Sequence, residues 1–326
     1  RAGGGVMPAA SFVYAPALSA WSLADDHPFR PVRLDVLRDL LLETQLLDAA
    51  EEVAPHPLPT GVLEGVHDAG YVAMVRRVSI GERPEAAYRY GLGTSDTPFA
   101  RHLHEAVTAV CAATWTGMDL LLRGTSLRVA AFSGGLHHAM PDRASGFCVY
   151  NDLAIAIEHA RREGARVAYI DLDAHHGDGV QTIFYDASDV LTISLHESGR
   201  YLFPGTGHSY ELGKGAGRGW SLNVPLEPFS GDASYLEVFD ILVPDAIAAF
   251  EPDVIVLQAG ADTHTLDPLA DLSLSLHGMR ASYERVVELA DSFAGGRLLV
   301  TGGGGYAAFQ VPPRAWAHAW SVMTGR

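Results

Sequence analysis

The chain has 326 residues, 48% of them hydrophobic, which is enough for a substantial core in one large domain or two smaller ones. Its 39 acidic and 23 basic residues give a net charge of −16, which argues against nucleic acid as a partner and favours cationic substrates. The apolar runs are too short to span a membrane, and the two cysteines allow one disulfide at most, so we expect a cytoplasmic protein that needs no disulfide.

The first residues differ in character from the rest of the chain. Residues 1–6 precede Met7, are rich in glycine and lack the apolar stretch of a signal peptide. We expect them to be a cloning remnant. No internal repeat or low-complexity linker divides the rest of the chain, so residues 7–326 are predicted to form a single domain.

The N-terminal third carries helical patterns separated by polar loops. Leucines recur at helical spacing over residues 34–47, with charges on the opposite face, which predicts an amphipathic helix. A short helical stretch is expected from His67, and a longer, alanine-rich helix over 102–122, before Gly124. Between them lies the polar loop 91–98, which contains Asp96.

The remainder alternates strand and helix patterns. Strands are predicted over 127–132, 167–170, 190–196, 253–258 and 297–300, and helices over 152–162, 234–250 and 282–293, with a bend or break near Pro244. This βαβ alternation predicts an α/β fold with a mainly parallel, doubly wound sheet and helices on both faces.

Four of these strands lead into polar residues suited to chemistry. The first leads to His137 and His138, the second to an aspartate and histidine cluster over 171–178, the fourth to Asp262, and the fifth through a run of glycines to Tyr306. The carboxyl ends of parallel strands open onto one edge of the sheet, where ligands bind in such folds. We therefore expect these side chains to converge.

The second cluster has the composition of a metal site. Asp173 and His175 are two residues apart, so their side chains leave an extended segment on the same face, and Asp262 is expected to join them. Carboxylate and imidazole ligands suit Zn²⁺, which would activate water for hydrolysis of an amide. The alternative is a solvated acidic turn with incidental histidines.

The other convergent residues fit the remaining roles of a hydrolase. His137 and His138 are candidates for the general base, and Asp171 and Asp178 can hold their far ring nitrogens. Tyr306 is a candidate donor to a developing oxyanion. The alternatives are a histidine pair in an ordinary turn and a tyrosine that caps the core.

Loop aromatics near these elements predict a narrow apolar slot. Phe147 follows Gly146, and Phe203 precedes a Pro-Gly pair. Two facing rings would enclose an aliphatic chain, whereas ordinary loop packing is the alternative.

Taken together, the motifs resemble those of the histone deacetylase superfamily, and more narrowly the bacterial acetoin-utilisation deacetylases. The segments that carry the resemblance are 134–138, 145–152, 171–179, 203–207, 260–262 and 302–306.

The resemblance implies an arginase-like fold and a zinc-dependent amidohydrolase that removes acetyl groups from acetyl-lysine side chains of proteins, or from small acetylated amines such as polyamines. By motif position, Asp173, His175 and Asp262 correspond to the zinc ligands. His138 corresponds to the general base and His137 to its electrostatic partner. Asp171 and Asp178 correspond to the carboxylates behind them, and Tyr306 to the residue that stabilises the transition state.

Further residues are implied in the same way. Gly146, Phe147, Phe203 and Leu269 match positions that line the substrate tunnel, and Asp96 matches the aspartate at its rim. The family also binds K⁺. One such site would use Asp171, Ser194 and main-chain oxygens of Asp173, His175 and Leu195; the other would lie near Phe184, Ala187, Val190 and Trp220.

The sequence departs from the family pattern at three places. The sequence of residues 263–268, which follow Asp262, is typical neither of the eukaryotic class I enzymes nor of polyamine deacetylases. It therefore does not identify the substrate. An extra residue lies beside Asp96, and Trp220 replaces the more usual tyrosine.

Two other functions fit the sequence less well. A two-manganese, arginase-like enzyme would need carboxylates where Ala174 and His176 stand, and a non-catalytic binding protein would have lost a histidine, a ligand or the tyrosine, none of which is missing. The oligomeric state is left open.

Overall fold

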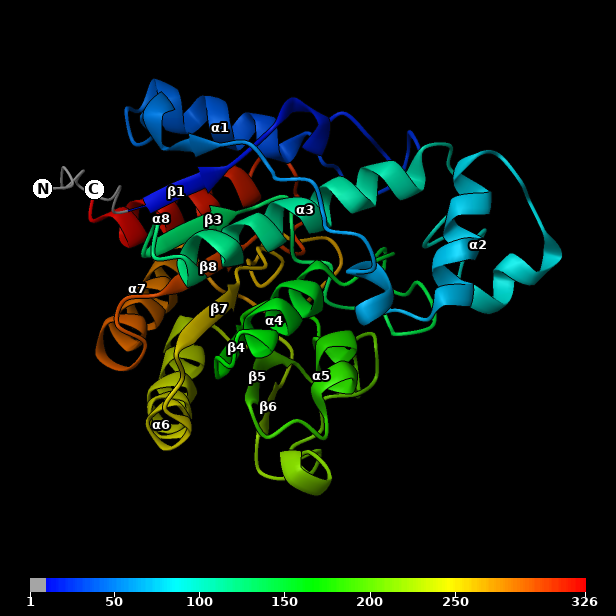
Figure 1. Cartoon of the computed structure of the whole chain (residues 1–326). Coiled ribbons are helices and arrows are strands. Elements are labelled where there is room, and N and C mark those ends of the chain that lie inside the picture. The colour runs from blue at the N-terminus through cyan, green and yellow to red at the C-terminus, as the bar shows by residue number, and fades with distance from the viewer. Residues whose placement is uncertain (1–9) are drawn as a thin grey trace, which may run out of the picture.

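Eight parallel strands form the centre of the computed structural model, which describes residues 10–326 (Figure 1). Their order across the sheet is β2-β1-β3-β8-β7-β4-β5-β6, and every neighbouring pair is parallel. The strands are β1 (Ala10–Val13), β2 (Glu52–Val53), β3 (Arg128–Ala131), β4 (Val167–Asp171), β5 (Val190–Glu197), β6 (Ser221–Leu226), β7 (Val254–Gln258) and β8 (Leu298–Thr301). The predicted parallel α/β fold is confirmed.

Helices cover both faces of the sheet (Figure 1). The α-helices are α1 (Arg33–Glu43), α2 (Ala69–Ser79), α3 (Leu103–Leu122), α4 (Asp152–Arg162), α5 (Asp178–Phe184), α6 (Asp232–Phe250), α7 (Leu276–Phe293) and α8 (Pro312–Thr324). Helices α1, α8, α7 and α6 pack side by side in one layer, and α3 packs against α4 and α2 in the other. The expected double winding is therefore present.

Most of the predicted elements lie within a few residues of their predicted positions, and the larger differences have local causes, whereas β1, β2, β6, α5 and α8 were not predicted. Helix α7 begins six residues before the predicted start, because the Ser275 side chain accepts a hydrogen bond from Gly278 N and caps the helix. Helix α6 continues through Pro244, so the expected break is wrong. The Asp240 carbonyl, which loses its helical donor there, belongs to an exposed residue that water can reach.

Two expectations from composition can be compared with the described residues. Cys111 and Cys148 are buried and unpaired, so no disulfide links them. Among residues 10–326, no helix has the length and apolar character that a membrane crossing requires. The predicted remnant at residues 1–6 lies outside the part of the chain that the structure describes.

The N-terminus of α4 fixes the turn that follows β3. The buried carboxylate of Asp152 accepts hydrogen bonds from Leu136 N at 2.7 Å, Gly135 N at 3.0 Å and the Thr114 hydroxyl at 2.6 Å. Three hydrogen bonds to one carboxylate hold the turn in one conformation. The histidine pair is thereby presented from a rigid support.

Asn151 strengthens this support and connects it to His67. Its Nδ2 donates to the carbonyls of His137 at 3.3 Å and Ala139 at 3.0 Å. Its own N–H donates to His67 Nε2 at 2.9 Å, while His67 Nδ1 lies 3.0 Å from the Met140 carbonyl. His67 is therefore neutral, with its proton on Nδ1.

This arrangement predicts a pH-dependent contribution to stability. Burial lowers the pKa of His67 to about 4, whereas an unfolded chain keeps about 6.5. Between these values the unfolded state binds more protons, so the contribution is complete above pH 6.5 and is lost as the pH falls toward 4. From pH 7 to pH 5, the wild type should lose about 2 kcal/mol more unfolding free energy than His67→Gln, whose amide can make both hydrogen bonds uncharged. Denaturant titration at both pH values measures this, and equal losses would contradict it.

Candidate metal centre and active site

The ends of β3, β4, β7 and β8 converge at one edge of the sheet, as predicted. The segment after β4 supplies Asp173 and His175, and the loop after β7 supplies Asp262. Their candidate ligand atoms all lie within 4.8 Å of one another, and all three residues are buried. His175 Nδ1 lies 2.9 Å from Asp262 Oδ2 and 3.3 Å from Asp173 Oδ1, so the three side chains face a common point.

Main-chain amides orient the two carboxylates. Asp173 accepts hydrogen bonds from His175 N at 3.0 Å and from Gly304 N at 2.7 Å, and Asp262 accepts one from Ala174 N at 2.8 Å. A side chain at Gly304 would collide with Asp262. The glycine-rich turn after β8 thus brings an N–H to the cluster, a role that sequence analysis did not assign to it.

The electrostatics of the cluster suit a bound divalent cation. Burial raises the pKa of Asp262, and the nearby Asp173 carboxylate raises it further. Two buried carboxylates this close are unfavourable without a compensating positive charge. The donor set of two carboxylates and one imidazole fits Zn²⁺ and leaves coordination positions open.

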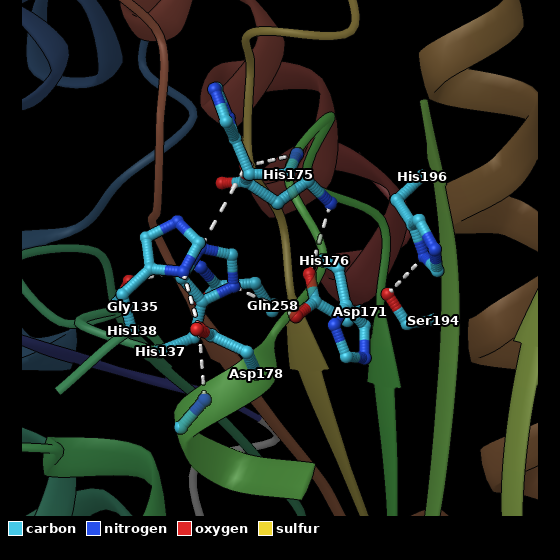
Figure 2. A network of polar contacts seen from close by, with 12 residues as sticks. Gly135, His137, His138, Asp171, His175, His176, Asp178, Ser194, His196 and Gln258 are labelled. Atoms are coloured by element: carbon cyan, nitrogen blue, oxygen red, sulfur yellow. Dashed lines mark hydrogen bonds and ion pairs between the residues drawn. The ribbon is translucent and has the colours of Figure 1, made fainter. Parts of the chain in front are cut away.

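His137 and His138 lie side by side next to this cluster, with Nε2 atoms 3.1 Å apart (Figure 2). His137 Nδ1 is 2.8 Å from Asp171 Oδ2, and His138 Nδ1 is 2.7 Å from Asp178 Oδ1. Each ring therefore has a carboxylate behind it, the arrangement expected for the two spare aspartates.

The two histidines are pushed to opposite protonation states. Burial opposes a charge on His137, but the Asp171 and Asp173 carboxylates outweigh it and raise the pKa of His137 to about 9. Burial lowers the pKa of His138 to about 4, and the charge on His137 adds to this effect. At neutral pH, His137 is the cation and His138 the neutral ring, whose Nε2 is the nitrogen able to take a proton.

A pocket of about 270 Å³ opens above the metal cluster. It is lined by Asp96, His138, Gly146, Phe147, His175, Leu202, Phe203, Leu269 and Tyr306. All five residues predicted to contact substrate are among them, and Leu202 is a lining residue that sequence analysis missed. Apolar side walls with a polar floor suit an aliphatic chain that ends in a polar group.

The rings of the pocket meet edge to face. The Phe203 and His138 ring centroids lie 4.9 Å apart, and those of Phe147 and Tyr306 lie 5.7 Å apart. Phe147 has a φ of 69°, in the left-handed region that a bulky residue rarely adopts, and it follows Gly146 at φ 51°. This uncommon backbone turns the Phe147 ring into the pocket.

Tyr306 stands at the end of the glycine-rich turn with its ring perpendicular to that of His175, at a centroid distance of 6.4 Å. Its N–H donates to Asp267 Oδ2 at 2.7 Å. Burial, together with the carboxylates of Asp262 and Asp173, raises the pKa of Tyr306 well above its usual value. The phenol therefore keeps its proton and can act as a donor.

The residues predicted to hold K⁺ lie around β4, α5 and β5. Asp171 and Ser194 are partners in the β4–β5 register, but the Ser194 hydroxyl lies 2.8 Å from His196 Nδ1. Phe184 is the last residue of α5 and Ala187 lies in the turn that follows, where Ala187 N donates to the Phe184 carbonyl at 3.0 Å. Val190 begins β5, Leu195 lies within it, and Trp220 directly precedes β6. Potassium binding stays a prediction.

Arg33 is a further buried residue that sequence analysis missed. Its guanidinium donates to the main-chain carbonyls of Gly305 at 2.8 Å and Gly303 at 2.5 Å, and lies over the rings of Phe29 and Trp316. It thereby supports the turn that carries Tyr306. The helical pattern over 34–47 gave no sign of this, because an arginine at a helix start is usually exposed.

Comparison with known proteins agrees with this geometry. Residues 27–323 match the model of the histone deacetylase domain. The chain belongs to the histone deacetylase family. It is 44% identical over 320 residues to the acetoin utilization protein AcuC of Bacillus subtilis, covering 96% of this chain and 82% of that protein. It is 40% identical over 312 residues to AcuC of Staphylococcus aureus strain MSSA476, covering 95% and 80%.

Solved structures of the histone deacetylase family show the same fold. The crystal structure of a histone deacetylase homologue from Aquifex aeolicus superimposes with a TM-score of 0.89 at 30% identity, covering 98% of this chain and 85% of that one. The structure of a homologue complexed with SAHA gives the same values. The chain is thus a hydrolase of the deacetylase class, and a deacetylase acts on an acetylated substrate.

Proposed function

We propose that this protein is a zinc-dependent deacetylase of acetyl-lysine side chains in proteins. The observation that carries the proposal is the buried cluster of Asp173, His175 and Asp262 at the floor of an apolar pocket whose walls include His138 and Tyr306. An extended side chain with an amide at its tip fits this shape. We take residues 7–326 to be one deacetylase domain that acts in the cytoplasm.

The residues around the cluster divide the chemistry among them. Zn²⁺ held by Asp173, His175 and Asp262 would polarise a carbonyl and lower the pKa of water. His138 takes a proton from the attacking water at Nε2 and returns it to the leaving amine, while Asp178 holds Nδ1. The Tyr306 hydroxyl donates to the carbonyl oxygen as negative charge develops there.

His137 has a different role from His138 in this scheme. The Asp171 carboxylate favours a positive charge on His137, and this charge would lower the pKa of His138 and add positive charge beside the reacting carbonyl. Asp171 stabilises that charge from 2.8 Å. The two histidines thus act as an electrostatic group and a base.

The pocket walls position the rest of the substrate. Phe147 and Phe203 enclose the methylene chain of the lysine, with Gly146 and Leu269 completing the walls, and Asp96 at the mouth accepts hydrogen bonds from the substrate main chain. K⁺ bound near Asp171 and Ser194 would stabilise the loops that carry the active-site residues.

Small acetylated amines are the second candidate substrate. The net charge of −16 would concentrate a cationic polyamine near the protein. The same charge also suits lysine-rich protein segments, so it does not decide between the two.

Competition between substrates tests the proposal. The zinc-reconstituted protein should hydrolyse an acetyl-lysine peptide with a higher kcat/KM than an acetylated polyamine, and a hydroxamate chelator should abolish the turnover. Preference for the polyamine would move the protein to the second candidate. Activity on neither substrate, with one zinc bound per chain, would refute deacetylation of both classes.

A further inference from the structure

One wall of the pocket stands on a loop rather than on a helix or strand. Leu202 and Phe203 lie between β5 and β6, and Phe203 is 45% exposed, so few apolar contacts hold its ring beside His138. The width of the slot between Phe147 and Phe203 therefore depends on the contacts that hold this loop against the rest of the protein.

A hydrogen-bonded polar relay runs beneath the loop. We define it by four residues: Glu211, Gln181, His176 and Thr206. Gln181 Nε2 donates to Glu211 Oε2 at 2.7 Å, Gln181 Oε1 lies 3.1 Å from His176 Nε2, and His176 Nδ1 lies 2.8 Å from the Thr206 hydroxyl. Gln181 and His176 are buried, whereas Thr206 lies at the surface.

The Glu211 carboxylate determines which atoms donate and which accept along the relay. A carboxylate only accepts hydrogen bonds, so Glu211 fixes the amide of Gln181 with its nitrogen toward the acid. Gln181 Oε1 then accepts from Ser221 at 2.9 Å and Asn223 at 2.7 Å, and His176 must donate to it from Nε2. A neutral His176 is left with a lone pair on Nδ1, which accepts the hydroxyl proton of Thr206.

Both ends of the relay return to the same loop. Thr206 is three residues after Phe203, and Glu211 also accepts from Gly207 N at 3.2 Å and His208 N at 3.1 Å. The main chain at Gly207 passes close to the rings of His196 and His176, because a side chain at this position would collide with both. The relay therefore restrains the loop at two points.

The other side of the relay is the segment that carries the metal centre. His176 directly follows His175 (Figure 2), and Gln181 lies in α5, three residues after Asp178. The relay thus connects the loop that carries Phe203 to the short segment that also carries His175 and Asp178. A displacement at Thr206 would move Phe203 relative to His138 and leave the metal cluster in place.

We propose that Thr206 is a positioning residue, whose hydrogen bond to His176 sets the position of the Phe203 wall and so the selectivity of the slot for acyl-chain length. The inference rests on the proposed deacetylase function. It assigns a selectivity role to a residue that touches neither substrate nor metal.

Two substitutions at the same position separate the hydroxyl from its neighbours. Thr206→Val keeps the shape and removes the donor, whereas Thr206→Ser keeps the donor and removes the methyl group. Thr206→Val should raise KM for an acetyl-lysine peptide about fivefold, the worth of one hydrogen bond, and lower the acetyl to butyryl ratio of kcat/KM by a similar factor. Zinc content and kcat should stay close to wild type, and Thr206→Ser should behave as wild type.

A merely structural role for Thr206 would give another pattern. A lower melting temperature and lower kcat at unchanged KM and unchanged acyl selectivity would overturn the proposal. So would equal effects of Thr206→Val and Thr206→Ser, since the methyl group would then be responsible.

A double-mutant cycle tests the relay itself. Glu211→Gln introduces a donor that competes with the Gln181 amide, so it should change acyl selectivity in the same direction as Thr206→Val. Because both act on one relay, their combined effect should be smaller than the sum. Strict additivity would show that the two residues act independently and would refute the relay.

Binding of a long-chain alkyl hydroxamate keeps the test separate from the proposed function. If the wild type turned over no acylated amine, the proposed function would fail, yet calorimetry of the zinc protein would still measure the slot. Thr206→Val should then weaken hydroxamate binding about fivefold and Thr206→Ser should not. Equal affinities would refute the positioning role alone.

Discussion

Replacing Asp173 by alanine is expected to abolish zinc binding and deacetylation together. The substitution removes one of three ligands and leaves His175 paired with Asp262 at 2.9 Å, so the imidazole is held by a carboxylate instead of by metal. It also leaves the buried N–H groups of His175 and Gly304 without their carboxylate acceptor, so the metal-free variant should be less stable than the metal-free wild type. Elemental analysis of the purified protein and denaturant titration measure the two effects.

His138→Ala is the matched control for Asp173→Ala. It removes the base from the same site and should lose activity while retaining one zinc per chain, because His138 is not among the three clustered ligands. Stoichiometric zinc in the Asp173→Ala variant would show that the ligand set is wrong.

Tyr306→Phe is expected to lower kcat about 100- to 1000-fold with little change in KM. The substitution keeps the ring that packs against Phe147 and His175, and removes only the hydroxyl. Loss of one preorganised donor to a developing oxyanion has an effect of this size. Because the donor acts mainly in the transition state, substrate binding should be preserved.

Steady-state kinetics with an acetyl-lysine peptide separates the two constants. The exposed Tyr210 provides a matched control, since Tyr210→Phe removes a hydroxyl from the loop beyond Phe203 and should leave kcat unchanged. A loss in the Tyr306→Phe variant that appeared entirely in KM would assign the hydroxyl to ground-state binding instead.

The sequence predicted the centre of the sheet and the convergence of its strand ends because both depend on local patterns. Buried strands such as β4 are continuous apolar runs, and the residues directly after each parallel strand must emerge at one edge of the sheet. Strands β1 and β2, of four and two residues, are too short for a pattern to distinguish them from loops.

The unpredicted parts of the site depend on contacts between distant residues. Arg33 is buried only because two glycine carbonyls and two aromatic rings meet it, and Leu202 lines the pocket from an irregular loop between β5 and β6 that carries no periodic pattern. In the sequence, His176 is notable only as a residue that stands where a two-manganese enzyme would need a carboxylate. Its hydrogen-bond partners are Gln181 and Thr206, and no periodic pattern in the sequence predicts that these residues meet.

The contact between Arg33 and Gly305 has a consequence for how the protein folds. The two residues are 272 positions apart, so the loop-closure entropy disfavours this contact until the intervening strands have assembled. During synthesis on the ribosome, Arg33 would be made early and would lack its hydrogen-bond acceptors until the glycine-rich turn was synthesised. Catalytic competence should therefore appear late in folding, when the start of α1 docks against the turn that follows β8, and partly folded forms should have no hydrolase activity.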